Sequence, residues 1–411
     1  MSAPIQEPSL YRKRFLTGNA LTSLGSGLTL PILVVYLHQM HGISISTASL
    51  VLAWMSVLGL LFAGVIGYLV DHYGPKPVLL TSIVIQAGGV AAWSLVHSLI
   101  SVFAVAAIVS LGQAGTWPPQ STLMARMVPE EERQRFFGLQ FMMLNLGLGV
   151  GGLLSALIVD VHDPSSFTRL FLLDAFSFLA YFAVVVSMRG VGNQIERTDA
   201  EKDEDGGYSE VLRDRRFVRL SITKFFLMLC GYASLDAGLP ALLTTYGGLS
   251  VKMLGPLWAF NTAAIVIGQV YVLNRLEGRS RTRLLSYVAL FFAVSWIVVG
   301  IGMAHPRATF VLAACGMVIF ACGEMIWSSV GPTLTNELAP EHLRGRYNAV
   351  DGLTWVTAGA IGPMISGLML QRALYSLWIA LIVLGLAVAF LLSLRLRQFL
   401  TPAQDGQPST F

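Results

Sequence analysis

The chain has 411 residues, of which 55% are hydrophobic and only 12% are charged. A soluble globular domain carries about twice that charged fraction, so the composition excludes an ordinary soluble protein and indicates one that lies in a membrane. The three cysteines, Cys230, Cys315 and Cys322, lie in apolar runs and in no CxxC or Cys/His pattern. We therefore expect no metal site, no disulfide framework and no cofactor.

Apolar runs long enough to cross a bilayer recur along the whole chain. A helical span needs about 20 mostly apolar residues, whereas a barrel strand needs about half that number and alternates in polarity. Residues 1–11 are polar and the first apolar run continues past Leu37, which favours a span that stays in the membrane over a cleaved signal. The sequence therefore predicts an all-α membrane protein with twelve spans. They cover residues 15–38, 48–70, 78–97, 99–125, 137–160, 167–188, 217–246, 253–274, 284–303, 308–336, 347–370 and 373–394.

The positive charges lie mostly on one side of this arrangement. With the N-terminus inside, 22 of the 27 Lys and Arg residues fall in inner segments. Inner segments of membrane proteins carry the excess of Lys and Arg, so the N-terminal residues 1–14 and the tail 395–411 are both predicted to be cytoplasmic. We expect a multi-pass protein of the plasma membrane. The outer segments hold only Arg169, Lys252, Arg307 and Arg372.

An acidic segment divides the spans into two groups of six. Residues 189–216 contain a run of acidic side chains beside Gly206 and Gly207, and they are predicted to form a solvated cytoplasmic linker. The predicted helix bundles on either side cover residues 15–188 and 217–394. A plain tether is the simpler interpretation of the linker, and a regulatory role is the alternative.

The chain repeats itself across this linker. The segment 129–136, PEEERQRF, precedes the fifth span, and the segment 340–347, PEHLRGRY, precedes the eleventh span 211 residues later. Two six-helix bundles related by a repeat are typical of secondary transporters, whose solute site lies between the halves near the midplane. The same offset pairs Thr122 with Thr333, Gly151 with Gly362 and Ser155 with Ser366.

A short motif lies in the loop between the second and third spans, where residues 67–76 read GYLVDHYGPK. The motif resembles the major facilitator superfamily signature G-x-L-a-D-r-x-G-r-k, with His72 and Pro75 in place of its two arginines. Together with the repeat, the resemblance covers the chain from Arg12 to about Arg397 and implies the twelve-helix major facilitator fold. The matching positions are Gly67, Leu69, Asp71, Gly74 and Lys76.

The resemblance implies that this loop is a conformational switch, with Gly67, Asp71, Gly74 and Lys76 as its residues. The residue types fit that role. Gly67 and Gly74 allow a close helix approach and a tight turn. Asp71 ends the second span with a charge that can meet a helix N-terminus or an arginine.

Two further motifs are similar to those of the drug:proton antiporter branch of that family. Residues 147–156, GLGVGGLLSA, resemble the antiporter motif of the fifth span, with Gly147, Gly151 and Gly152 as helix-packing candidates. Ordinary packing of small residues between helices is the alternative. The fourth-span motif of the branch maps onto residues 110–114, where Ser110 replaces the membrane-embedded arginine that the branch associates with proton coupling.

Two carboxyl side chains fall near the middle of predicted spans, Asp236 in the seventh and Glu324 in the tenth. Ionisable groups at membrane depth are costly, so each is a functional candidate. In the fold that the resemblance implies, spans one, four, seven and ten line the central cavity. Asp236 and Glu324 are therefore the proton-coupling candidates. A permanently protonated or hydrogen-bonded packing residue is the alternative for each.

Other polar and aromatic residues of the cavity-lining spans are candidates for contact with a solute. They are Asn19, Gln113, Trp117 and Trp327, and interhelical hydrogen bonding or packing is the alternative for all of them. Two charged residues receive structural interpretations. Asp174 is expected to stabilise its helix at the outer interface, and Lys224 is expected to extend from the inner end of the seventh span to the lipid headgroups.

No nucleophile–base pair, metal-ligand spacing or phosphate loop stands out in the sequence, so we expect a transporter and not an enzyme. The leading hypothesis is a proton-coupled exporter (an antiporter) of lipophilic or cationic small molecules that works by alternating access. The alternatives are a facilitator or symporter for one metabolite, such as a sugar, amino acid or organic acid, and a non-transporting sensor. The predicted partners are a small-molecule substrate, protons and the lipid bilayer, with no nucleic acid, and the protein is expected to be a monomer.

Overall fold

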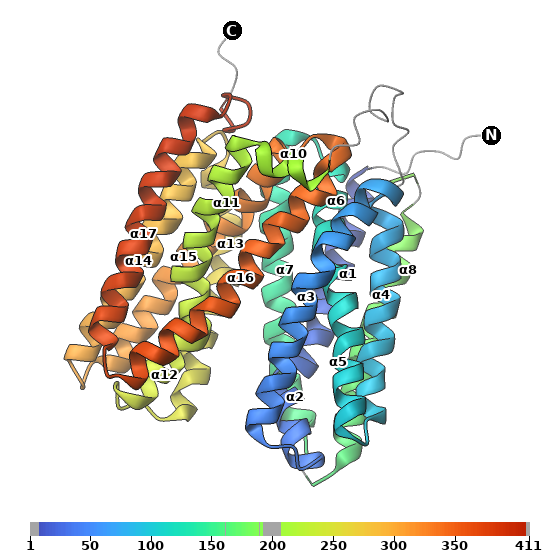
Figure 1. The fold of residues 1–411 in the computed structure, drawn as a ribbon, viewed down its shortest axis with the longest axis vertical. Coiled ribbons are helices and arrows are strands. Elements are labelled where there is room, and N and C mark those ends of the chain that lie inside the picture. The colour runs from blue at the N-terminus through green and yellow to red at the C-terminus, as the bar shows by residue number, and fades with distance from the viewer. Residues whose placement is uncertain (1–7, 161, 189, 192–206, 408–411) are drawn as a thin grey trace. The chain divides into compact units, whose positions relative to one another are not determined.

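The protein is helical throughout the part of the chain that the computed structural model describes, which comprises residues 8–160, 162–188, 190–191 and 207–407 (Figure 1). Among these residues there is no strand, and twelve helical stretches are long and apolar enough to cross a membrane. The predicted all-α fold with twelve spans is therefore confirmed. Up to the acidic segment, the main helices are α1 (Pro8–Thr29), α2 (Leu33–Val35), α3 (Ile45–Tyr73), α4 (Pro75–Ala92), α5 (Leu99–Ala114), α6 (Trp117–Met127), α7 (Glu130–Ile158) and α8 (Pro164–Ser187).

The second half of the chain contains a further set of helices and one long π-helical stretch, η4 (Met228–Gly238). The α-helices of this half are α10 (Tyr208–Arg213), α11 (Arg215–Leu227), α12 (Leu239–Thr245), α13 (Leu254–Leu276), α14 (Arg281–Ala304), α15 (Thr309–Leu338), α16 (Arg344–Gln371) and α17 (Tyr375–Leu396). Most of the predicted linker, residues 189 and 192–206, lies outside the described residues. Its final part is helical, because α10 and the first residue pair of α11 fall within it.

Proline lies at or beside three of the interruptions within individual spans. The first span tightens into a 3-10 turn at Leu30–Ile32, which contains Pro31. The fourth span breaks between α5 and α6, directly before Pro118 and Pro119. Proline lacks the amide hydrogen of a helix interior and clashes with the preceding turn, so a helix is restarted or wound differently there. In the seventh span the π-helical η4 is followed by α12, where Pro240 lies in the first turn.

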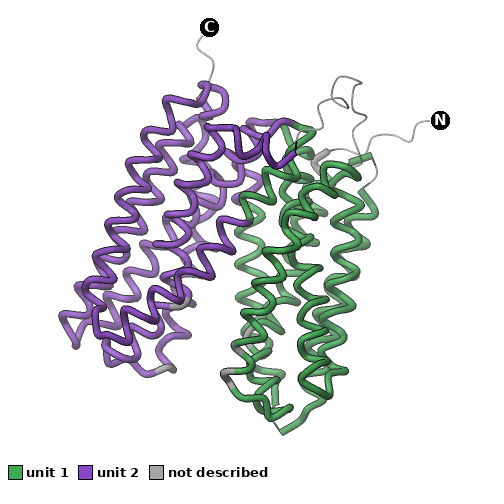
Figure 2. The backbone as a smooth tube through the Cα atoms, in the orientation of Figure 1, with its two compact units in different colours: residues 1–129, 139–205, 341–352 green, residues 130–138, 206–340, 353–411 purple. Residues whose placement is uncertain are grey.

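The chain divides into two compact units (Figure 2). Unit 1 comprises Met1–Pro129, Leu139–Asp205 and Glu341–Gly352, and unit 2 comprises Glu130–Gly138, Gly206–Pro340 and Leu353–Phe411. The start of α7 thus belongs to unit 2 and the start of α16 to unit 1. These starts coincide with the repeated segments 129–136 and 340–347, so the repeat marks the two places where a helix passes from one unit to the other.

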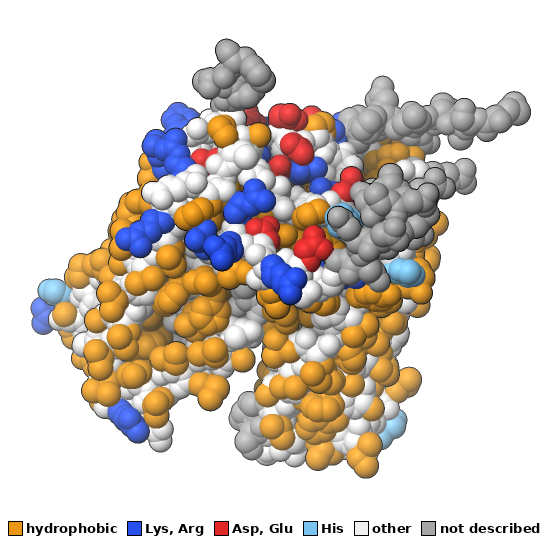
Figure 3. All heavy atoms as spheres, turned by 45° about the horizontal axis from the view of Figure 1, so that its top comes forward, with side chains coloured by type: hydrophobic (Ala, Val, Ile, Leu, Met, Phe, Trp, Pro, Cys, Tyr) orange, Lys and Arg blue, Asp and Glu red, His pale blue; other side chains and the backbone are white. Residues whose placement is uncertain are grey.

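The surface composition fits a lipid-facing protein. On the face drawn in Figure 3, Lys and Arg side chains gather toward one end of the helices, and hydrophobic side chains cover their flanks. Several large apolar side chains are more than half exposed, among them Leu61, Leu157 and Ile267. Exposed apolar side chains along the helices suit the hydrocarbon core of a bilayer, and Lys and Arg side chains at their ends suit the headgroup region.

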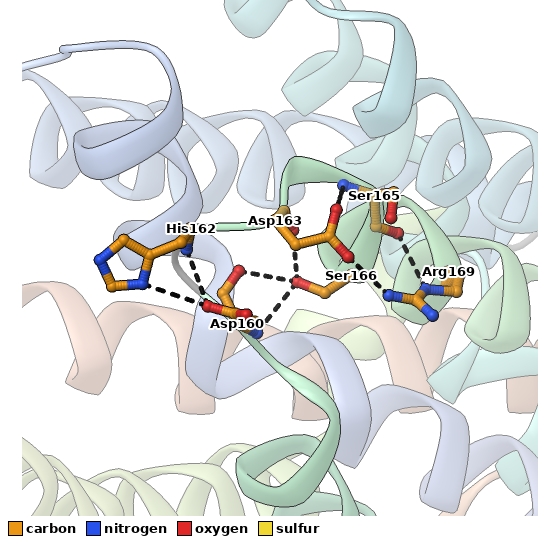
Figure 4. Close-up of polar contacts among 6 residues, drawn as sticks. All are labelled: Asp160, His162, Asp163, Ser165, Ser166 and Arg169. Atoms are coloured by element: carbon orange, nitrogen blue, oxygen red, sulfur yellow. Dashed lines mark hydrogen bonds and ion pairs between the residues drawn. The ribbon is translucent and has the colours of Figure 1, made fainter.

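The turn between α7 and α8 is held by local polar contacts (Figure 4). Asp163 caps α8 by accepting a hydrogen bond from the Ser165 backbone N–H at 2.9 Å, and it accepts a second from Arg169 Nη2 at 2.8 Å. Hydrogen bonds from the Ser165 side chain and backbone, together with the nearby Arg169, favour the charged carboxylate, so the pKa of Asp163 lies below its usual value of 3.8. The ionised cap therefore stabilises the start of α8.

Candidate functional site

Glu324 on α15 is a buried carboxyl group inside unit 2, with 7% of its surface exposed. Its Oε2 accepts a hydrogen bond from Asn261 Nδ2 on α13 at 2.5 Å, and the same Nδ2 also lies 3.4 Å from the Met317 carbonyl. Within the described part of the chain no Lys or Arg forms an ion pair with Glu324. The carboxyl group therefore has a neutral amide as its partner, which distinguishes it from a structural salt bridge.

Asp236 lies at the end of the π-helical η4, and its side chain is exposed. It is close enough to Glu324 for the two carboxyl groups to interact electrostatically. The structure thus brings the two predicted proton-coupling candidates together within unit 2, one exposed and one buried. Their role in coupling stays a prediction.

Tyr232 is a third member of this cluster that the sequence did not single out. The residue lies in η4, is 8% exposed and interacts electrostatically with both Glu324 and Asp236. Its ring packs edge-on against Phe292 and Phe320, with centroids 5.6 and 5.5 Å away. Because π-helical segments re-aim side chains and often occur at functional sites, η4 is the element that positions Tyr232 and Asp236 beside Glu324.

Lys224 on α11 does not reach the headgroups, so that prediction was wrong. The side chain is 1% exposed, and its Nζ donates to the Gly331 carbonyl at 3.2 Å and to Thr335 Oγ1 at 3.0 Å. The ammonium group also lies 5.1 Å from the ring centre of Trp327. A buried cation is stabilised by such dipoles and by an aromatic face, so Lys224 fastens the seventh span to the tenth inside unit 2.

The remaining cavity-lining candidates fall in different environments. Asn19 is 3% exposed and its Oδ1 accepts a hydrogen bond from Gln140 Nε2 at 3.2 Å, which joins α1 to α7. Gln113 is exposed, and Trp117 is half-buried in the first turn of α6. Trp327 is 9% exposed beneath Lys224. Contact of any of these residues with a solute stays a prediction.

Asp174 on α8 lies in the interior of unit 1 and not at an interface, which corrects the interpretation from sequence. It is 1% exposed and accepts hydrogen bonds from Thr29 Oγ1 at 2.6 Å and from Ser177 Oγ at 3.4 Å. The absence of a side chain at Gly25 leaves the space that the Asp174 and Ser177 side chains occupy. The residue therefore links α8 to α1 through hydroxyl donors.

Asp71 of the loop motif binds the start of α16 within unit 1. Its two carboxylate oxygens accept hydrogen bonds from the backbone N–H groups of Gly345 and Arg346, at 2.6 and 3.0 Å. The Arg346 side chain lies 3.7 Å away, and the Asp71 side chain is 1% exposed. An anion at a helix N-terminus is stabilised both by the free N–H groups and by the helix dipole.

The glycines of this contact are required by space and by backbone conformation. A side chain at Gly345 would come within 2.6 Å of the Gly67 carbonyl oxygen and of Asp71 Oδ1. Gly74 ends α3 with a φ of 88°, a conformation that residues with a side chain rarely adopt. Lys76 donates to the carbonyls of Met188 and Val186 and so caps the end of α8. The role of the loop as a switch stays a prediction.

The repeat places a related contact in unit 2. Arg135, which corresponds to Arg346 at the offset of 211 residues, donates from Nη1 to Asn274 Oδ1 at 2.8 Å and to Glu277 Oε1 at 3.0 Å. Asn274 lies in the last turn of α13 and Glu277 directly follows it. The segment 340–347 thus contacts the end of α3 within unit 1, and the segment 129–136 contacts the end of α13 within unit 2.

The glycines of the antiporter-like motif lie where α7 crosses α1 in unit 1. A side chain at Gly147 would come within 2.6 Å of the Ala20 carbonyl oxygen, and one at Gly151 would overlap the carbonyl oxygen of Leu24. Gly152 has no such restriction, since the nearest atom, the Gly27 oxygen, would lie 4.0 Å away. Small residues thus bring the two backbones together, as in other membrane helix pairs.

We expect Gly151→Ala to destabilise the protein by about 1–3 kcal/mol, because the added methyl group forces α1 and α7 apart. Gly152→Ala is the matched control, and its thermal midpoint in detergent should equal that of the parent within error. Fluorescence-detected size-exclusion chromatography after heating measures both. Equal midpoints for Gly151→Ala and Gly152→Ala would contradict the close crossing.

The twelve-span helical fold, with polar groups buried within each unit, defines a multi-pass membrane protein. The family model described as Major Facilitator Superfamily matches residues 15–363. The chain belongs to the major facilitator superfamily, whose members are transporters and not enzymes.

Curated relatives align over nearly the whole chain. An uncharacterised MFS-type transporter of Bacillus subtilis, YttB, is 25% identical over 395 residues, covering 94% of this chain and 96% of that protein. The multidrug resistance protein MdtH of Klebsiella pneumoniae is 25% identical over 377 residues, covering 88% of this chain and 87% of that protein.

Solved structures show the same fold at lower identity. A bacterial homologue of the iron transporter ferroportin in an outward-facing state has a TM-score of 0.79 with 15% identity, covering 94% of this chain and 99% of that chain. The human organic anion transporter MFSD10 has a TM-score of 0.73 with 17% identity, covering 94% and 100%. These likenesses show the fold alone.

Proposed function

We propose that the protein exports lipophilic or cationic small molecules across the plasma membrane in exchange for protons, by alternating access. The observation that carries the proposal is the carboxyl cluster of unit 2, in which buried Glu324 has the amide of Asn261 as its partner and Asp236 lies nearby. The termini are proposed to be cytoplasmic and the working unit a monomer.

Hydration sets the free-energy cost of ionising Glu324. Ionising a carboxyl group without a cationic partner is costly in a dry environment and cheap in a hydrated one. A conformational change that opens or closes water access to Glu324 would therefore change how tightly the group holds its proton. Asp236 is exposed and interacts with Glu324, so it is the candidate for passing the proton between water and the buried group.

The proposed solute class rests on a relative and on chemistry. MdtH, which aligns over most of the chain, is named a multidrug resistance protein. A carboxylate that has released its proton attracts a cationic solute, and a protonated one does not. Release of the proton thus strengthens the binding of a cationic solute, whose lipophilic part binds without the charge, so proton binding and solute binding oppose each other, which is the requirement for exchange.

The proposal is tested with purified protein in liposomes that carry an imposed pH gradient. We expect a lipophilic cation such as ethidium to be driven toward the acidic side, and the movement to stop when the gradient is collapsed with an ionophore. A sugar and an amino acid serve as comparison solutes. Gradient-independent movement of either comparison solute, without movement of the cation, would favour a metabolite facilitator and overturn the proposal.

A further inference from the structure

The tail that follows α17 folds back onto unit 2. After the short 3-10 turn η7 (Arg397–Phe399), residues 401–407 form a compact turn, closed by hydrogen bonds from Asp405 N to the Thr401 carbonyl and from Gln407 N to the Pro402 carbonyl. Asp405 within this turn is only 2% exposed. Burying a carboxylate is costly unless hydrogen-bond donors or a cation compensate it, so Asp405 requires a specific partner.

That partner is the N-terminus of α14. Asp405 Oδ2 accepts a hydrogen bond from Ser280 Oγ at 2.6 Å, and Oδ1 accepts one from the Thr282 backbone N–H at 2.8 Å. The Arg281 N–H donates to the backbone carbonyl of Asp405, also at 2.8 Å. The tail thus satisfies N–H groups that a helix start leaves unpaired and places a negative charge at the positive end of the helix dipole.

The same tail holds the side chain of Arg281. Its Nη1 donates to the Gln404 carbonyl at 3.0 Å and lies 3.9 Å from Glu337 Oε1, and only 6% of the side chain is exposed. A side chain at Gly406, which has a φ of 74°, would come within 3.1 Å of Arg281 Nε. The turn therefore fits closely around the guanidinium group and directs it at Glu337.

Glu337 in turn holds the start of α7. Its Oε1 accepts a hydrogen bond from Arg133 Nη1 at 3.0 Å, and the two side chains are 5% and 9% exposed. Arg133 lies in the segment Glu130–Gly138, which belongs to unit 2, whereas the rest of α7 belongs to unit 1. A continuous set of buried polar contacts therefore runs from the tail through Arg281 and Glu337 to the helix that passes between the units.

We propose that Asp405 is a positioning residue for the conformational step of transport, acting through Arg281 on the contact between Glu337 and Arg133. With the tail docked, Arg281 contributes a second positive charge to Glu337, and the start of α7 is held in unit 2. When the tail leaves, α14 keeps its Ser280 cap but loses the acceptors of the Arg281 and Thr282 N–H groups, and the Arg281 side chain is free to move away. Buried polar networks behave as units, so loss of one member weakens the others. The proposal rests on alternating access in the proposed function and is independent of proton coupling.

The test follows the start of α7 directly, without a transport assay. Spin labels are placed at the exposed positions Glu131 and Arg279 of the full chain, in a background with the three native cysteines replaced, and their distance distribution is measured in lipid nanodiscs. In the parent, one distance should dominate. In Asp405→Ala the ratio of docked to undocked populations should fall about tenfold, as expected for loss of hydrogen bonds to a charged group.

Three further variants separate this role from a general stabilising one. Gly406→Ala, which keeps every charge, should also lower the docked fraction, whereas removal of residues 408–411 should not change it. In a Glu337→Gln background, Asp405→Ala should change the ratio of docked to undocked populations by less than about twofold, because the ion pairs of Glu337 with Arg281 and Arg133 are already lost. An unchanged distribution in Asp405→Ala, or an equal additional shift in the Glu337→Gln background, would overturn the proposal. Failure of proton coupling would leave these distances unaffected.

Discussion

Glu324→Gln should reduce pH-gradient-driven accumulation of solute to less than about a tenth of the parent rate, while solute exchange without a gradient continues. Glutamine keeps the shape of the carboxyl group and can still form a hydrogen bond with Asn261, but it cannot bind and release a proton. Accumulation against a gradient needs the proton, whereas exchange of bound solute for free solute does not. Transport by the purified variant in liposomes, with and without an imposed pH gradient, measures both.

The companion variants identify the group that titrates. If Asp236 only passes the proton on, Asp236→Asn should reduce gradient-driven transport less than Glu324→Gln does. If the two carboxyl groups titrate as a pair, the two substitutions should reduce gradient-driven transport by the same factor. Glu131→Gln, which alters an exposed carboxyl group at the start of α7, is the control and should leave transport unchanged. Uphill transport at the parent rate in both single variants and in the double variant would show that these carboxyl groups are structural.

Asp71→Asn should lower the turnover of transport about tenfold and change equilibrium solute binding by less than about twofold. The substitution removes the charge that accepts two backbone hydrogen bonds at the start of α16 and that faces Arg346. Because this contact lies at the end of α3 and not in the carboxyl cluster of unit 2, its loss should affect the rate of conformational change. Turnover in liposomes and solute binding by the detergent-purified protein are the two measurements.

A matched glycine pair tests the same contact without altering charge. Gly345→Ala should reproduce the loss of turnover, because the added methyl group would push α16 away from Gly67 and Asp71. Gly352→Ala lies two turns further along the same helix, has no atom within 4 Å of the added group, and should behave as the parent. Weakened binding with normal turnover in Asp71→Asn would contradict a switching role.

The fold followed from the sequence because hydropathy over about 20 residues is a strong local signal. The ends of the spans were less accurate. The fifth span was predicted from residue 137, yet α7 begins at Glu130, because three glutamates in the first turn suit the positive end of a helix and continue it beyond the apolar run. A hydropathy pattern marks the membrane-embedded part and does not register a charged extension of the same helix.

The pairings within the candidate site could not be read from the sequence in the same way. Glu324 was identified as an unusual charge in an apolar run. Its partner Asn261 lies 63 residues away in the sequence and belongs to no recognisable motif. Lys224 was assigned to the headgroups because it lies near the end of a span, and only the structure shows the Gly331 carbonyl and Trp327 around it. Asp405 gave no signal at all, since an aspartate in a polar tail is ordinary until the tail folds back.

Exchange of a proton for a solute at Glu324 is tested most directly by proton movement that the solute itself drives. Liposomes with equal pH on both sides and a pH-sensitive dye inside are given a gradient of the lipophilic cation alone. With the parent protein we predict proton flow opposite to the solute, and with Glu324→Gln we predict solute movement without proton flow. Proton flow at the parent rate in Glu324→Gln, or no proton flow in the parent while the solute moves, would contradict proton–solute exchange at Glu324.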